Sequence, residues 1–326
     1  MERIKAAIAG GAGYTGGELI RLLLGHPRVD IVSVHSKSNA GNPLHQVHQD
    51  LLGQTDMRFS GETDKDVDVL FLCLGHGESH RYLDENDIPD RVRVIDLSQD
   101  FRLPDTCTHG DRRFTYGLPE CNRGEIGEAH DIANPGCFAT AIQLALLPAA
   151  HHGLPAAVHV TGITGSTGAG QGLSASSHFS WRANNIQPYK SLRHQHLLEI
   201  GATLRRLQPL DPPRVHFVPW RGDFTRGIFV SAQMHWPTDK PALADLYREY
   251  YAGHPFTHVS DGDIFLKQVV NTNNCVIQVE TNNGQAVVHA AIDNLLKGAS
   301  GQAVQNMNLL FGRAEDEGLR LKANYF

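Results

Sequence analysis

The chain begins its first recognisable pattern at Ile4-Lys-Ala-Ala-Ile-Ala9 and runs directly into Gly10-Gly-Ala-Gly-Tyr-Thr-Gly16. The first run is short and mostly apolar, which predicts a buried strand, and leucines then recur at helical spacing up to Leu24. Glycines between a strand and a helix allow a tight turn, close approach of the backbone to a pyrophosphate, and close helix–sheet packing. The spacing is Gly-x-x-Gly-x-x-Gly rather than Gly-x-Gly-x-x-Gly, and it indicates a dinucleotide-binding turn.

Apolar runs alternate with helical patterns as far as Ala133. Strands are predicted at 30–35, 67–74, 92–97 and 130–133. This alternation predicts an α/β fold with a Rossmann-type doubly wound parallel sheet. After about residue 155 the strand candidates are separated by longer loops, which predicts a second α+β domain with a mixed sheet. These strand candidates are 158–163, 215–218, 227–234, 275–281 and 286–292. Helices are predicted at 138–147, 197–207, 242–251 and 295–311.

Composition excludes several classes of protein. The 326 residues are 41% hydrophobic and 20% charged, which is typical of globular chains. Lys plus Arg is 29 against 35 for Asp plus Glu, a net charge of −6, which argues against nucleic-acid binding. No apolar run is long enough to span a membrane. The five cysteines form no CxxC pair, so we expect no metal site and no disulfide framework, and a reducing cytoplasm.

The segment after the second predicted strand indicates which dinucleotide binds. An NAD enzyme usually places Asp or Glu about 20 residues past the glycines, on the ribose 2′-hydroxyl. Here the chain reads His35-Ser36-Lys37-Ser38, and two hydroxyls with a cation suit a 2′-phosphate. We therefore predict NADP(H), with cofactor contacts from Gly10, Gly13, Tyr14, Thr15, Gly16, Ser36, Lys37, Ser38 and Gly75.

One cysteine differs from the other four. Cys137 follows a strand and a Pro-Gly turn and begins a predicted helix. A thiol at a helix N-terminus is stabilised as thiolate by the macrodipole and unpaired N–H groups. By contrast, Cys73 and Cys275 lie in apolar strand runs, and Cys107 and Cys121 lie in polar segments expected to be loops.

The segment Ile132-Ala-Asn-Pro-Gly-Cys-Phe-Ala-Thr-Ala141 resembles the active-site signature of the N-acetyl-γ-glutamyl-phosphate reductase family. Six further segments with family resemblance follow one another in order along the chain: 10–18, 96–103, 116–120, 165–170, 194–200 and 293–298. The resemblance implies a glyceraldehyde-3-phosphate-dehydrogenase-like fold. It also implies an NADPH-dependent enzyme of arginine biosynthesis that makes N-acetylglutamate semialdehyde.

The family chemistry implies roles for named residues. Cys137 attacks the acyl phosphate and forms a thioester, and His194 serves as acid/base, with His196 nearer the substrate. We expect His194 to hold the thiolate as an imidazolium, although which histidine is the acid/base stays open. Substrate contacts are expected from Arg102, Asn134, Ser166, Thr167, His196 and Glu199, and Arg182 is a further candidate anion ligand. Asn294 resembles the family's cofactor-binding residue near the nicotinamide.

The resemblance also implies the domain organisation. Residues 1–136 and 294–326 form the dinucleotide-binding domain, and 137–293 form the catalytic and oligomerisation domain. The partners expected are a small acyl-phosphate substrate and a second copy of the chain, in a homodimer or homotetramer.

Alternative functions remain open at this point. The same chemistry could act on N-succinylglutamyl phosphate or on a carrier-bound aminoadipyl phosphate. A redox sensor that binds NADP without turnover would not need Cys137 and His194 together. The context Pro-Gly-Cys-Phe-Ala-Thr differs from the Cys-Asn and Cys-Thr-Thr-Asn contexts of aspartate-semialdehyde and glyceraldehyde-3-phosphate dehydrogenases.

Overall fold

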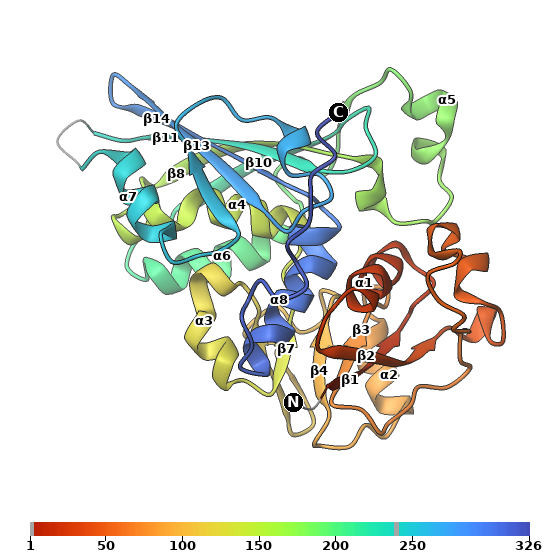
Figure 1. The fold of residues 1–326 in the computed structure, drawn as a ribbon. Helices are drawn as coiled ribbons and strands as arrows, with labels where there is room; N and C mark the ends of the chain where they lie inside the picture. The colour runs from red at the N-terminus through yellow and green to blue at the C-terminus, as the bar shows by residue number, and fades with distance from the viewer. Residues whose placement is uncertain (1–2, 238–240) are drawn as a thin grey trace. The chain divides into compact units, whose positions relative to one another are not determined.

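The computed structural model describes residues 3–237 and 241–326, and the chain divides into two compact units. Each unit is assembled from two stretches of chain, as the colours in Figure 1 show: unit 1 is Met1–Pro135 with Ala299–Arg320, and unit 2 is Gly136–Gly298 with Leu321–Phe326. The predicted boundaries therefore differ from these units at Gly136, 294–298 and 321–326, which belong to unit 2. Backbone hydrogen bonds from Gly298 to Asp293 (2.9 Å) and from Asn324 to Val270 (3.0 Å) hold these segments there.

Unit 1 is built on one sheet in the order β2-β1-β3-β4-β7-β6-β5, in which every pair is parallel except the terminal β5–β6 hairpin. Its strands are β1 (Ile4–Ala9), β2 (Val29–His35), β3 (Val69–Leu72), β4 (Arg93–Asp96), β5 (Thr108–His109), β6 (Arg112–Tyr116) and β7 (Asp131–Ala133). Its helices are α1 (Tyr14–Leu24), α2 (Glu78–Glu85), α3 (Pro119–Glu128) and α8 (Gly301–Leu310).

The central strands of this sheet are covered on both faces. All four residues of β3 are buried, and Tyr82 and Leu83 of α2 pack with Leu70 and Leu72 on one side. The helix α8 packs against α1 and α3 within unit 1. This arrangement confirms the predicted doubly wound parallel sheet. Cys121 was expected in a loop, but it lies on α3.

Unit 2 contains a mixed sheet in the order β12-β13-β14-β11-β8-β10-β9, which confirms the predicted α+β architecture. Its strands are β8 (Ala157–Thr164), β9 (Gln187–Pro188), β10 (Arg214–Arg221), β11 (Ile228–His235), β12 (Thr257–Ser260), β13 (Cys275–Asn282) and β14 (Gln285–Ile292). Its helices are α4 (Cys137–His151), α5 (Phe179–Arg182), α6 (His196–Leu207) and α7 (Leu243–Tyr251). The helix α4 was predicted to end at Leu147, but it continues through Pro148 to His151.

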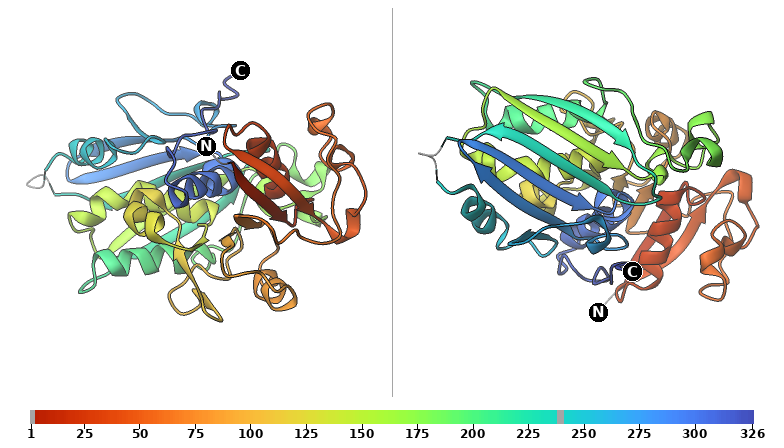
Figure 2. Two further views of the ribbon diagram at one scale, coloured as in Figure 1. Left: turned by 60° about the horizontal axis from the view of Figure 1, so that its bottom comes forward. Right: turned by 90° about the horizontal axis from the view of Figure 1, so that it is seen from above.

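The two faces of this second sheet differ. On β8, buried residues alternate with exposed Ala157, His159 and Thr161, as expected of a sheet with one covered face. The buried face packs on α4, and Tyr251 of α7 donates a hydrogen bond to the Leu144 carbonyl at 2.6 Å. The right-hand view of Figure 2 shows the strands of the other face with no helix in front of them.

Candidate active site

The turn between β1 and α1 has the geometry of a dinucleotide site. Gly10 has φ +80°, and a Cβ there would lie 2.3 Å from the Cys73 carbonyl oxygen, so only glycine fits. A Cβ on Gly16 would lie 2.7 Å from the Cα of Gly11, which shows how closely α1 packs on the turn. A Cβ on Gly13 would meet only the Gly10 oxygen at 3.8 Å, so the turn is open there.

The start of α1 offers hydrogen-bond donors beside this opening. At the start of the helix, an i→i−4 hydrogen bond runs from the Gly17 N–H to the Gly13 carbonyl at 2.9 Å. The N–H groups of Tyr14, Thr15 and Gly16 precede it in the chain and belong to the first turn. A helix N-terminus of this kind binds phosphate through its N–H groups and its dipole.

The segment after β2 is polar and carries no acid. Asn39 donates hydrogen bonds to both Ser36 Oγ and Ser38 Oγ at 3.1 Å, so the two hydroxyls are held together. The exposed Lys37 ammonium lies 3.7 Å from Glu85, which leaves it free to reorient. Asn39 was missed at the sequence level because only the short turn Lys37–Asn39 brings its amide back to the serines.

The predicted cofactor residues of unit 1 gather at one edge of the sheet. β1 pairs in parallel with both β2 and β3, so the turns at Gly10, Ser36 and Gly75 follow the carboxyl ends of three adjacent strands. Ligands of open α/β sheets bind at this edge. A glycine turn with an open Gly13, a helix N-terminus and two hydroxyls beside a lysine together fit a dinucleotide that carries a 2′-phosphate.

In unit 2, Cys137 is the first residue of α4. Gly136 is the N-cap and makes no side-chain cap, and the first turn carries no acid. The backbone N–H of Gly136 instead donates to Glu199 Oε2 at 3.0 Å. A Cβ on Gly298 would lie 2.8 Å from the Cβ of Cys137, so this glycine packs directly against the cysteine.

The other cysteines differ in their surroundings. Cys73 and Cys275 are buried, and burial raises the pKa of the Cys73 thiol to about 12. Cys137 is only partly buried. A partly exposed thiol at a helix N-terminus is the kind that reacts.

The imidazole ring of His194 is packed among other aromatic rings, which fix its orientation. Ring centroids lie between 4.7 and 5.7 Å from the imidazole for four neighbours: Phe138, Tyr189, His196 and Phe217. The His196 N–H donates to Nδ1 of His194 at 3.3 Å, so Nε2 carries the proton of the neutral ring.

The pKa of His194 is lowered to about 4, chiefly by burial and also by the positive charge of Lys190, while the Glu199 carboxylate acts in the opposite direction. The ring is therefore neutral at pH 7. This differs from the expected imidazolium, because desolvation outweighs the nearby carboxylate.

Tyr189 interacts with both His194 and Cys137. It was not predicted from the sequence. Its ring makes an edge contact with His194 at 5.7 Å between centroids. Burial raises the pKa of Tyr189, and the Cys137 sulfur raises it further by electrostatic repulsion. No sequence pattern marks this tyrosine, because only the pairing of β9 with β10 brings it to the site.

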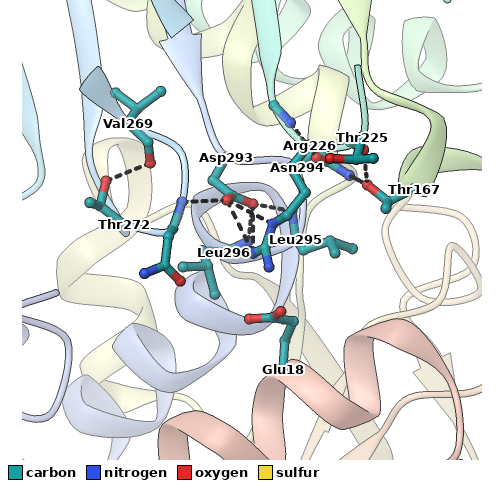
Figure 3. Close-up of polar contacts among 12 residues, drawn as sticks. Glu18, Thr167, Thr225, Arg226, Val269, Thr272, Asp293, Asn294, Leu295 and Leu296 are labelled. Carbon is teal, nitrogen blue, oxygen red and sulfur yellow. Dashed lines mark hydrogen bonds and ion pairs between the residues drawn. The ribbon is translucent and has the colours of Figure 1, made fainter. Parts of the chain in front are cut away.

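The loop at Ser166 and Thr167 is tied to a second loop by Asn294 (Figure 3). Asn294 Nδ2 donates to Thr167 Oγ1 at 3.0 Å, and its Oδ1 accepts from the Gly227 N–H at 2.7 Å. The Ser166 N–H donates to the Phe224 carbonyl at 2.9 Å. Asn294 was predicted to face the cofactor. Its amide oxygen and amide nitrogen both form hydrogen bonds within unit 2.

Asp293 anchors the same region and was not predicted as functional. It is fully buried, and its carboxylate pairs with Arg226 at 3.1 Å (Figure 3). It also accepts backbone N–H groups of Asn271 (2.7 Å), Leu295 (2.8 Å) and Leu296 (3.1 Å). Its signal in the sequence was its position directly after a buried strand.

Two predicted substrate residues meet inside unit 1. The Arg102 Nε donates to the Asn134 carbonyl at 2.8 Å, and its Nη2 donates to the Leu97 carbonyl at 2.8 Å. Asn134 is buried and bonds to Ala299 and Asn306. The remaining pair, His196 and Glu199, is buried on the first turn of α6.

The described ranges 3–237 and 241–326 lack two other features. They contain no group of three or more His, Cys, Asp or Glu side chains that could hold a metal ion. None of their helices is both long enough and apolar enough to cross a membrane.

Two family models match the chain. Residues 5–129 match the semialdehyde dehydrogenase NAD-binding domain, and residues 137–294 match the semialdehyde dehydrogenase dimerisation domain. Among solved structures, aspartate semialdehyde dehydrogenase II of Vibrio cholerae covers 96% of this chain and 99% of its own, with TM-score 0.71 and 17% identity. Aspartate semialdehyde dehydrogenase with NADP from Candida albicans covers 95% and 99%, with TM-score 0.70 and 16% identity. At such identities the likeness shows the fold alone.

Curated relatives are much more similar in sequence. The N-acetyl-gamma-glutamyl-phosphate reductase of Christiangramia forsetii is 50% identical over 324 residues, covering 99% of this chain and 100% of its own. The protein of the same name from Phocaeicola vulgatus is 50% identical over 325 residues, with the same coverage. These relatives confirm the predicted resemblance, and the chain belongs to the N-acetyl-gamma-glutamyl-phosphate reductase family.

Proposed function

We propose that this protein uses NADPH to reduce N-acetyl-γ-glutamyl phosphate to N-acetylglutamate semialdehyde and phosphate, in arginine biosynthesis. The observation that carries the proposal is the placement of Cys137 at the N-terminus of α4, coupled through Tyr189 to the His194 ring. The full-length similarity to reductases of that name supports the choice of substrate.

The nucleophile is the Cys137 sulfur, ionised with the help of the first N–H groups of α4. It attacks the acyl carbon, the carbon–sulfur bond forms, and phosphate leaves with the electrons of the carbon–oxygen bond. The acyl group is then held as a thioester at one fixed atom. The Glu199 carboxylate fixes the turn before the sulfur by accepting the Gly136 N–H.

The neutral His194 ring acts on the acyl oxygen. Its Nε2–H, free of the bond that occupies Nδ1, donates to that oxygen as negative charge develops. That hydrogen bond stabilises the oxyanion of each tetrahedral state, and the oxyanion re-forms the carbonyl as the carbon–sulfur bond breaks and the Cys137 thiolate leaves the aldehyde. His196, Ser166 and Thr167 supply further polar contacts to the substrate.

The cofactor is held by unit 1. The Gly10–Gly16 turn and the N-terminus of α1 take the pyrophosphate, and Ser36, Lys37 and Ser38 take the 2′-phosphate. When bound, NADPH supplies the hydride for the carbonyl carbon. Gly75 completes the predicted contacts from unit 1.

The proposal includes assembly and location. The chain forms a homodimer through the uncovered face of the unit 2 sheet, since residues 137–294 match a dimerisation domain. None of the five cysteines forms a disulfide within the described chain, which suits a reducing cytoplasm.

The test is the reverse reaction with purified protein. N-acetylglutamate semialdehyde, phosphate and NADP⁺ should yield NADPH, followed at 340 nm, and Cys137→Ala should abolish the signal. The same assay with the N-succinyl aldehyde decides the acyl group. Equal activity with the N-succinyl compound, or activity that survives in Cys137→Ala, would contradict the proposal.

A further inference from the structure

The segment between Ser166 and His194 buries a positive charge that is only partly satisfied. Arg182 is 7% exposed, and its Nη2 donates to the carbonyls of Asn185 (2.7 Å) and Arg221 (3.3 Å). Its Nε and Nη1 are buried without a hydrogen-bond partner. Burying a charge without a partner is costly, so these two donors point to an anion that completes the site.

Arg221, whose backbone carbonyl accepts a hydrogen bond from Arg182, carries a second guanidinium. Its guanidinium carbon lies 4.9 Å from the centre of the Tyr189 ring, its Nη1 lies 3.4 Å from Ser176 Oγ, and its side chain also hydrogen-bonds Tyr189. Within the described chain, neither Arg182 nor Arg221 has a carboxylate within 4.0 Å. The neighbouring Asp223 accepts the Asn184 N–H at 2.7 Å instead.

The Arg221 guanidinium is separated from the His194 imidazole by one aromatic ring, that of Tyr189. Tyr189 contacts the Arg221 guanidinium with its face and the His194 ring with its edge. The pairing of Arg221 with Gln187 across β9 and β10 fixes this order. Lys190 adds a third positive charge, and its Nζ donates to Gln195 at 3.0 Å.

We propose that Arg182 and Arg221 form a carboxylate subsite that binds the α-carboxylate of the substrate's glutamyl chain. This inference rests on the proposed function. The phosphate is bonded directly to the reacting carbon, whereas the α-carboxylate carbon lies four bonds from it, about 5 Å in an extended chain. A guanidinium separated from His194 by the Tyr189 ring suits the distant group, and the planar guanidinium matches a carboxylate in two-point hydrogen bonding.

The reverse reaction separates the two anions, because the aldehyde carries the carboxylate and phosphate is a distinct substrate. Steady-state kinetics are measured for the wild type, Arg221→Gln, Arg182→Gln and Arg182→Lys. We expect the KM for N-acetylglutamate semialdehyde to rise about 10- to 100-fold in the Gln variants. The KM values for phosphate and NADP⁺ should stay within about threefold. Arg182→Lys keeps the buried charge and therefore replaces Arg182→Gln if that variant does not fold. Its KM for N-acetylglutamate semialdehyde should lie between those of the wild type and Arg221→Gln.

The analogue 4-acetamidobutanal lacks the α-carboxylate and tests the assignment directly. The wild type should use it with a kcat/KM lowered about 10- to 100-fold, and Arg221→Gln should lower that value no further. The control Arg214→Gln changes an exposed arginine at the far end of β10 and should behave as wild type.

Three outcomes would overturn the subsite. The first is an equal loss of kcat/KM for both aldehydes in Arg221→Gln. The second is a KM increase confined to phosphate, and the third is unchanged kinetics in every variant. A wild type that turns over neither aldehyde overturns the proposed function itself, and the subsite with it.

Discussion

At the scale of single residues, the site depends on glycines as much as on reactive side chains. Gly298 lies in the segment 293–298 and leaves room for the nucleophile, because a Cβ there would come within 2.8 Å of the Cys137 Cβ. The contact is between a backbone position and the base of a side chain. Neither can yield without moving α4 or the turn that follows Asp293.

We expect Gly298→Ala to lower kcat/KM by about 100-fold, because displacing a reacting atom by about 1 Å costs on that order. The rate of Cys137 alkylation by iodoacetamide should change as well. Gly172→Ala is the matched control, since a Cβ there meets nothing within 4 Å. Wild-type activity in Gly298→Ala would show that the sulfur position does not matter.

The depressed pKa of His194 has a consequence for pH dependence. The folded-state pKa is about 4 against an ordinary 6.5, so the unfolded chain binds the proton more tightly. His194 therefore contributes stability that is complete above pH 6.5 and is lost as pH falls from 6.5 toward 4. Urea unfolding of the wild type and His194→Gln at pH 7.5 and pH 5 tests this. The variant should lose less stability between the two pH values, and an identical loss would contradict the assignment.

At the scale of elements, two helices cooperate on the nucleophile. Glu199, on the first turn of α6, is buried and accepts the N–H of Gly136 just before α4 begins. Its predicted contact with the substrate stays a prediction, and the bond to Gly136 is a separate contact through which Glu199 can position the nucleophile.

Glu199→Ala should leave a buried N–H without its acceptor and lower the free energy of unfolding by about 1–3 kcal/mol. It should also lower kcat/KM, whereas Glu199→Gln keeps an acceptor oxygen and should recover part of both losses. Urea denaturation and steady-state kinetics measure the two effects. If the Ala and Gln variants were equally impaired, the hydrogen bond to Gly136 would not be the reason.

Elements with strong apolar patterns were predictable from the sequence, and weakly patterned ones were not. The strand β3 is buried at every position, and the helix α1 repeats leucines on one face, so both were predicted. The helix α2 buries only Ser79, Tyr82 and Leu83, and α3 is kinked at Asn122, so neither gave a helical pattern. The strand β6 begins with arginines because Arg112 pairs with the buried Asp131.

The same limit applies to the site. Cys137 and His194 stood out by motif and position. Tyr189, Arg221 and Asn39 did not stand out. Tyr189 and Arg221 are brought together by the pairing of β9 with β10. Asn39 reaches Ser36 only because the chain turns between them.

At the scale of the whole molecule, the uncovered face of the unit 2 sheet bears on assembly. Thr161 is exposed on β8 and is flanked in register by Val218 of β10 and Ser231 of β11. Charge at the centre of an interface is unfavourable. Thr161→Arg should therefore convert the proposed homodimer to a monomer by light scattering, while Asp111→Arg, in the exposed β5–β6 turn, should not. An unchanged dimer would place the interface elsewhere.

The division of unit 1 into two stretches also determines the order in which the protein can fold during translation. Its final helix, α8, is buried along nearly its whole length and lies in the last stretch, Ala299–Arg320. All of Gly136–Gly298 leaves the ribosome first, so unit 2 can begin to fold while the N-terminal sheet still lacks a helix that packs on α1 and α3. Until α8 emerges, the nascent chain exposes apolar surface that chaperones recognise, and a premature stop near residue 298 leaves that surface permanently open.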